Sequence, residues 1–133
     1  MGVWGVGSFD SDEALDVIDA VLEPEGDDPL REFIDRSTWN DKELSHYTAT
    51  QMVAACEIVA ALIGNPSPTL PEELAVWVEE NKDYDVSSLI PLCKEAIEEM
   101  VAEGAPARDM WLREEKYLEW VKSVKGVGER LNS

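Results

Sequence analysis

The chain has 133 residues, with 29 acidic side chains against 11 basic ones and a formal net charge of −18 at pH 7. A chain of this length folds as one domain around a sizeable core. So many carboxylates repel nucleic acid and anionic membranes, which excludes both as partners, and they attract a cationic partner at long range. The alternative explanation is that the acidity serves solubility alone.

The acidic residues are concentrated in two parts of the chain. Residues 1–44 contain 13 acids and 3 bases, a net charge of −10, and residues 72–103 contain 10 acids and 2 bases, a net charge of −8. The beginning of the chain has neither the basic residues nor the long apolar run of a signal peptide. Cys56 and Cys93 lie in apolar helical patterns, so we expect reduced core thiols in a cytoplasmic protein.

The first ten residues predict an irregular N-terminal clamp. Glycines surround Trp4, and the large side chains of Trp4 and Phe9 are expected to hold this backbone against the core. The glycines match neither a dinucleotide-binding loop nor a P-loop. Asp10 is the expected N-cap of a helix over about residues 11–22, and Glu13 is expected to complete a capping box.

The opening reads Met1-Gly2-x-Trp4-Gly5-x-Gly7-x-Phe9-x-x-Asp12. This motif, followed by an amphipathic helix, resembles the start of a bacterial family of unknown function, DUF4259. The resemblance continues through the Ala-rich residues 48–63 and the helix start Leu70-Pro71-Glu72-Glu73, and it ends in the segment that contains Trp111 and Trp120. It departs from the common opening at positions 8 and 11, where serines replace Pro and Asn. The resemblance implies a shared fold and no particular activity.

Residues 23–28 form an acidic turn that lacks the ligand spacing of an EF-hand, so we expect a solvated loop rather than a calcium site. Asp28 and Pro29 are the expected N-cap and first residue of a short helix to about residue 36. His46 is the only histidine. Without a second His or clustered Cys it does not predict a zinc site.

Residues 48–63 predict the central helix, because they are apolar nearly all round and rich in alanine. Glu57 is the only charged residue among these sixteen positions. A buried carboxylate costs free energy unless it is paired, so Glu57 is expected either to face out through a gap or to meet a Tyr or Lys. Gly64 and Pro66 end the helix.

Two further helices are expected over about residues 71–81 and from Ser88, as N-cap, to the break at residues 104–106. They are expected to form an antiparallel pair packed on the central helix. Residues 108–131 predict one broken helix or two short ones. The core-closing side chains expected there are Trp111, Leu118, Val121 and Val124. Gly126 and Gly128 weaken the last turns, so residues 126–133 are expected to fray.

The sequence therefore predicts an all-α fold, with residues 1–133 as a single domain. The expected architecture is a helical bundle or HEAT-like array of five to seven helices around the buried central one. No segment predicts a strand, and no catalytic, metal-binding or cofactor-binding constellation stands out, so we expect a protein that is not an enzyme.

The function hypothesis is an acidic protein-binding inhibitor, namely an immunity protein that neutralises a basic nuclease toxin by occupying its cleft. The alternatives are a DNA-mimic regulator of another DNA-binding protein and a helical module without enzymatic activity. The favoured binding face consists of six carboxylates in and after the 71–81 helix: Glu72, Glu73, Glu79, Glu80, Asp83 and Asp85. The alternative face consists of four on the first helix: Asp12, Glu13, Asp16 and Asp19.

Overall fold

The computed structural model describes residues 7–9, 11–23, 28–35 and 44–132. These residues contain seven α-helices and no strand, which confirms the predicted all-α class. The helices are α1 (Asp12–Leu22), α2 (Pro29–Ile34), α3 (His46–Leu62), α4 (Glu72–Glu80), α5 (Leu89–Met100), α6 (Pro106–Arg113) and α7 (Tyr117–Arg130).

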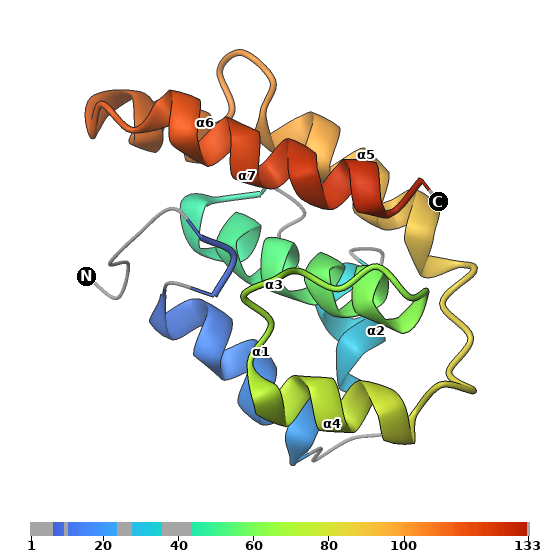
Figure 1. Ribbon diagram of the computed structural model, residues 1–133. Helices are drawn as coiled ribbons and strands as arrows, with labels where there is room; N and C mark the ends of the chain where they lie inside the picture. The colour runs from blue at the N-terminus through green and yellow to red at the C-terminus, as the bar shows by residue number, and fades with distance from the viewer. Residues whose placement is uncertain (1–6, 10, 24–27, 36–43, 133) are drawn as a thin grey trace.

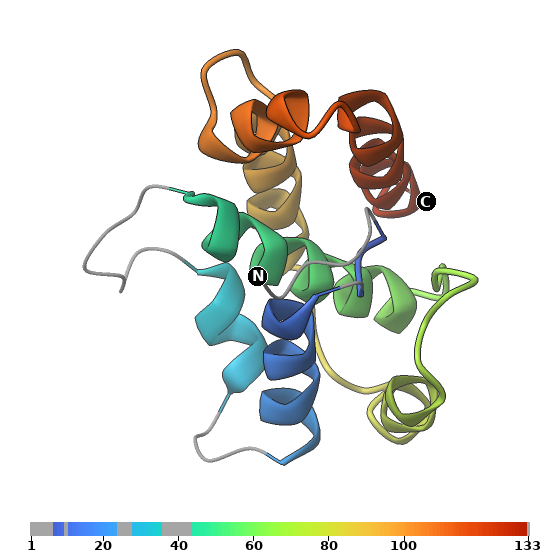
Figure 2. The ribbon, with the colours of Figure 1, turned by 90° about the vertical axis from the view of Figure 1, so that its left-hand side faces the viewer.

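The fold is organised around α3, which contacts every other helix (Figures 1 and 2). On one side of it lie α1, α2 and α4, and on the other side lie α5, α6 and α7. Contacts between α2 and α5 connect the two groups directly. The predicted central helix is thus confirmed as the centre of a bundle.

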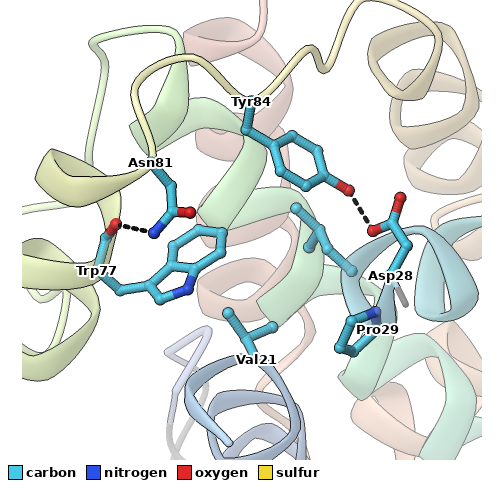
Figure 3. Close-up of a pocket in the computed structure, with 7 residues that line it drawn as sticks. Val21, Asp28, Pro29, Trp77, Asn81 and Tyr84 are labelled. Atoms are coloured by element: carbon cyan, nitrogen blue, oxygen red, sulfur yellow. Dashed lines mark hydrogen bonds between the residues drawn. The ribbon is translucent and has the colours of Figure 1, made fainter. Parts of the chain in front are cut away.

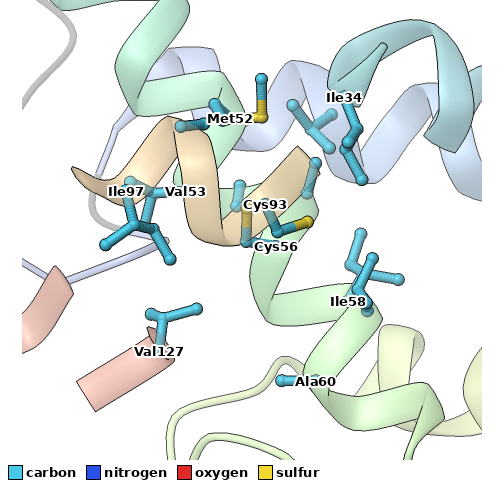
Figure 4. Close-up of a cluster of buried hydrophobic side chains, with 14 of the residues drawn as sticks. Ile34, Met52, Val53, Cys56, Ile58, Ala60, Cys93, Ile97 and Val127 are labelled. Carbon is cyan, nitrogen blue, oxygen red and sulfur yellow. The ribbon is translucent and has the colours of Figure 1, made fainter. Parts of the chain in front are cut away.

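The apolar surface of α3 explains this position. Alanines such as Ala54, Ala55 and Ala60 are fully buried and keep the helix thin, so that neighbouring helices approach it from several directions. Figure 4 shows side chains of α2, α5 and α7 meeting those of α3, with Cys93 of α5 beside Cys56. Both cysteines are buried and free, as the apolar pattern predicted.

Two helices end in the same backbone motif. Gly64, with φ of 96°, follows α3; its N–H donates to the carbonyl of Ala61 at 3.0 Å, and the next N–H donates to Ala60 at 2.9 Å. Glu115, with φ of 59°, follows α6 and makes the equivalent bond to Leu112 at 3.2 Å. These are Schellman caps, which require the left-handed conformation that favours glycine.

The start of α1 differs from the prediction. Ser11 is the N-cap, and its Oγ accepts a hydrogen bond from the N–H of Ala14 at 3.0 Å. Asp10 lies outside the described residues. With Ser11 as the cap, Glu13 is the second helical residue and not the third, so it cannot complete a capping box. The cap of α2 is as predicted, because Asp28 accepts from the backbone N–H of Arg31 at 3.2 Å.

The predicted antiparallel pair of α4 and α5 is wrong. Both helices contact α3, but they do not contact each other. Ser88 precedes α5 without capping it, and its Oγ accepts a hydrogen bond from Nη2 of Arg31 at 3.0 Å instead. A bond between residues 57 positions apart therefore replaces the expected local one.

The C-terminal segment forms two helices, one of the two arrangements predicted, but the predicted inward face of α7 is partly wrong. Leu118 is 78% exposed, whereas Trp120 is 5% exposed. The buried stripe consists of Trp120, Val124, Val127 and Leu131, spaced to lie on one face of the helix. The helix also continues through Gly126 to Arg130, where a frayed tail was expected, because this stripe packs on the core.

The N-terminal clamp is seen only in part. Phe9 is 9% exposed and belongs to the core, as predicted. Trp4 and Gly5 lie outside the described residues.

Candidate partner-binding surface

The favoured acidic face lies on α4 and the turn after it, and all six of its carboxylate residues are exposed: Glu72, Glu73, Glu79, Glu80, Asp83 and Asp85. Glu79 forms an ion pair with Lys82 at 3.7 Å, with both side chains largely in solvent, where such a pair is weak. Oδ1 of Asp85 accepts from the backbone N–H of Ser87 at 3.0 Å, and this bond lowers the pKa of Asp85. The face is therefore negatively charged at neutral pH.

The alternative face on α1 is less complete. Asp12, Asp16 and Asp19 are exposed, but Glu13 is half-buried. Its Oε2 is buried without a hydrogen-bond partner in the described part of the chain. The prediction that Glu13 belongs to an exposed acidic face is therefore wrong. Because α1 and α4 contact each other, the two acidic faces lie on neighbouring helices.

A pocket of about 240 Å³ adjoins the favoured face, and sequence reasoning did not identify it (Figure 3). It lies between the end of α1, the start of α2 and the end of α4. Its lining residues are Val21, Asp28, Pro29, Leu30, Trp77, Asn81 and Tyr84. Three of them alternate with the carboxylates of the favoured face along residues 77–85, so the pocket opens among negative charges.

Two aromatic rings form one part of this pocket. The centroids of Trp77 and Tyr84 are 6.4 Å apart, with 54° between the ring planes. Nδ2 of Asn81 donates to the backbone carbonyl of Trp77 at 2.7 Å, and in Figure 3 the amide oxygen points away from that bond, towards the ring of Tyr84. The pocket thus combines flat apolar surfaces with a hydrogen-bond acceptor.

Asp28 holds Tyr84 in place. The phenol donates a hydrogen bond to Oδ1 of Asp28, across 56 residues of chain. Burial, and then this bond, raise the pKa of Tyr84 well above its usual range, so the phenol is neutral at physiological pH. Oδ2 of Asp28 also pairs with Nε of Arg31 at 3.4 Å, and Arg31 in turn reaches Ser88. The start of α2 is therefore bonded to the middle and to the last residue of the segment 81–88, which connects α4 and α5.

Glu57 is a structural acid and not part of this surface. Its side chain is 2% exposed, and Oε1 accepts a hydrogen bond from Nη1 of Arg130. The sequence predicted either a side chain facing out through a gap or a Tyr or Lys partner, and both alternatives are wrong. The arginine that pairs with Glu57 lies in a segment that was expected to fray. Nδ2 of Asn65 also donates to the backbone carbonyl of Arg130 at 3.0 Å, so two bonds join the last turn of α7 to α3 and to the turn after it.

His46 lies at the start of α3, and its ring is 6.1 Å from that of Trp111 in an edge-to-face arrangement. Both ring nitrogens are buried without a hydrogen-bond partner among the described residues. Within the same residues, no group of three or more His, Cys, Asp and Glu side chains could hold a metal ion. None of the helices in the described ranges combines the length and apolar character that crossing a membrane requires.

The fold and the surface define a small, strongly acidic helical protein with a pocket beside the acidic face on α4. The chain belongs to the DUF4259 family, described as a domain of unknown function, whose family model matches residues 2–123. This match confirms the family that the N-terminal motif resembled. Comparison with curated proteins and with solved structures gave no match.

Proposed function

We propose that this protein is a cytoplasmic inhibitor without enzymatic activity of its own that binds a basic partner protein through the face formed by α4 and the turn after it. The observation that supports this most directly is the exposure of all six carboxylates of that face, next to a pocket with aromatic walls. Interfaces derive specificity and fast association from charge complementarity, and aromatic side chains dominate their binding energy.

The proposed partner is a nuclease toxin, which would make the protein an immunity protein. A nuclease binds the phosphates of its substrate in a basic cleft, and a rigid row of carboxylates presents similar negative charge to such a cleft. A DNA-mimic regulator of another DNA-binding protein is the alternative, since the same complementarity would serve it.

The first test is genetic and biochemical. We expect a gene for a basic nuclease next to the gene for this protein, and we expect the purified protein to inhibit that nuclease at a one-to-one ratio. The association rate should fall steeply as salt is raised, because screening shortens the range of the attraction. The triple variant Glu79→Lys, Glu80→Lys, Asp83→Lys should associate much more slowly at low salt.

The matched control reverses three exposed acids on the alternative face: Asp12, Asp16 and Asp19. It changes the net charge by the same amount, so only the position of the reversed charges differs. A stronger effect of the control variant would move the interface to α1. Inhibition and salt dependence that neither variant changes would show that the acidity serves solubility alone.

A further inference from the structure

We propose that the pocket between Trp77, Asn81 and Tyr84 binds one arginine side chain of the partner protein. This inference rests on the proposed function, because it specifies how the favoured face recognises a basic protein. The volume of the pocket, about 240 Å³, lies below the range of roughly 300–1,000 Å³ that is typical of sites for small-molecule ligands, so a single protruding side chain is the appropriate occupant.

The charges around the pocket favour a cation. Val21 lies in the last turn of α1, and Asn81 is the C-cap of α4, so two helices direct their C-terminal ends to this region. A helix C-terminus carries partial negative charge, and neither helix has a basic residue in its last turn to offset it. Glu79 and Glu80 add full charges at the end of α4, and Lys82, which pairs with Glu79, offsets one of them.

The shape and chemistry of the walls favour a guanidinium over an ammonium group. A guanidinium is flat and weakly hydrated, so it stacks on an aromatic face while its N–H groups donate in the plane. Trp77 and Tyr84 supply the faces, and the amide oxygen of Asn81 is an acceptor beside them. The fold already contains one such contact, since the guanidinium carbon of Arg108 is 4.9 Å from the centroid of the Tyr117 ring.

The walls are also fixed in advance, which lowers the entropic cost of binding. The bond from Tyr84 to Asp28 holds one ring, and the bond from Asn81 to the carbonyl of Trp77 fixes the amide. Arg31 does not fill the site, because its guanidinium is bonded to Asp28 and Ser88. Asp28 and Arg31 therefore act as positioning residues for the pocket.

The test uses the full chain and small probes, so that it does not depend on finding the partner. N-acetyl-arginine amide should shift the indole N–H signal of Trp77 in NMR spectra saturably, in the millimolar range expected for a single side chain. N-acetyl-citrulline amide, which has nearly the same shape without the charge, should shift it at least tenfold less. N-acetyl-lysine amide should bind more weakly than the arginine probe. Equal shifts from arginine and citrulline, or no saturable shift, would overturn the proposal.

Four variants locate the site. Asn81→Ala should weaken arginine binding several-fold, while Glu119→Gln, an exposed change on α7 outside both acidic faces, should leave it unchanged. Trp77→Phe should retain part of the binding that Trp77→Leu loses, with the Trp77 variants followed through the ring signals of Tyr84. Circular dichroism and thermal unfolding check that each variant folds. Loss of binding in Glu119→Gln, or full binding in Asn81→Ala, would contradict the assignment.

The probes separate this inference from the proposed function. If the arginine probe binds the pocket but no nuclease is inhibited, the proposed function fails and the pocket stands. If the nuclease is inhibited equally by Trp77→Leu and the unchanged protein, and the probe does not bind, the pocket assignment fails and the proposed function stands.

Discussion

Arg130, in the last turn of α7, donates a hydrogen bond to the buried carboxylate of Glu57 in the middle of α3, 73 residues earlier in the chain. The pair joins the helix at the centre of the fold to the helix that completes it. Since the side chain of Glu57 is 2% exposed and that of Arg130 is 26% exposed, the acid depends on its partner more than the base does.

Replacing Arg130 alone should therefore destabilise the protein more than replacing both residues of the pair. Arg130→Met leaves a buried carboxylate without compensation and should lower the free energy of unfolding by about 3 kcal/mol, whereas replacing both residues, as Glu57→Leu with Arg130→Met, should recover most of that loss. Urea unfolding of the single and double variants measures both quantities. A double variant that is as unstable as the sum of the single ones would show that the two residues act independently.

At the two Schellman caps, introducing a glycine and removing one should change the stability in opposite directions. Glu115 has φ of 59°, so Glu115→Gly should stabilise the protein by about 0.5–1 kcal/mol through relief of backbone strain. Gly64 has φ of 96°, and a Cβ there would meet nothing within 4 Å, so Gly64→Ala should destabilise by about 1 kcal/mol for backbone reasons alone. Thermal unfolding of both variants checks the signs, and the same sign for both would contradict this explanation.

His46 should make stability depend on pH in a defined window. Burial lowers its pKa below the usual value of 6.5, and the nearby Glu13 offsets this only in part. As the pH falls, the unfolded chain therefore binds the proton before the folded protein does. The contribution of neutral His46 to the free energy of unfolding is fully present above about pH 7, and it is lost as the pH falls through 6.5 towards the folded-state pKa.

The measurement for His46 is the unfolding free energy against pH in the unchanged protein and in His46→Gln. The difference between the two curves should be constant above about pH 7 and should change in favour of the glutamine variant at lower pH. The carboxylates titrate in both proteins, so most of their contribution cancels. A difference that is independent of pH would show that His46 has the same pKa in both states.

The buried thiols should be unreactive in the folded protein. Burial, and next the adjacent Cys93, raise the pKa of Cys56 well above its usual value, so little thiolate is present at neutral pH. We expect a thiol-specific disulfide reagent to react with Cys56 and Cys93 only at the rate of unfolding. Addition of urea should accelerate the reaction in parallel with the unfolded fraction, and rapid reaction without urea would contradict the burial of both residues.

Sequence reasoning succeeded where one local signal determined the structure. The apolar character of residues 48–63 predicted the central helix, and Asp28 with Pro29 predicted the start of α2. It failed where contacts between residues far apart in the sequence determined the structure. Nothing local to Ser88 indicates that its hydroxyl accepts from Arg31 rather than from its own helix, and Gly126 weakens a helix end that tertiary packing nevertheless stabilises.

The candidate surface also has one part that a local pattern predicts and one part that depends on distant residues. The exposure of the four glutamates on α4 followed from helical spacing around Leu74 and Val78, which are buried. The pocket was not predicted, because its lining residues come from three helices and a turn that lie far apart in the sequence. The bond between Tyr84 and Asp28 brings the turn after α4 to the start of α2, and a bond across 56 residues leaves no trace in a local pattern.

The position of Arg130 also has a consequence for the order of events during synthesis. A ribosome releases the chain from its N-terminus, so α3 emerges long before the guanidinium that neutralises Glu57. Until then the carboxylate can remain in the water that the last helix will later displace, which disfavours early closure of the half of the bundle formed by α5, α6 and α7. Closure of that half should therefore follow the emergence of Arg130 from the ribosome, and a chain truncated before Arg130 should still be recognised by chaperones.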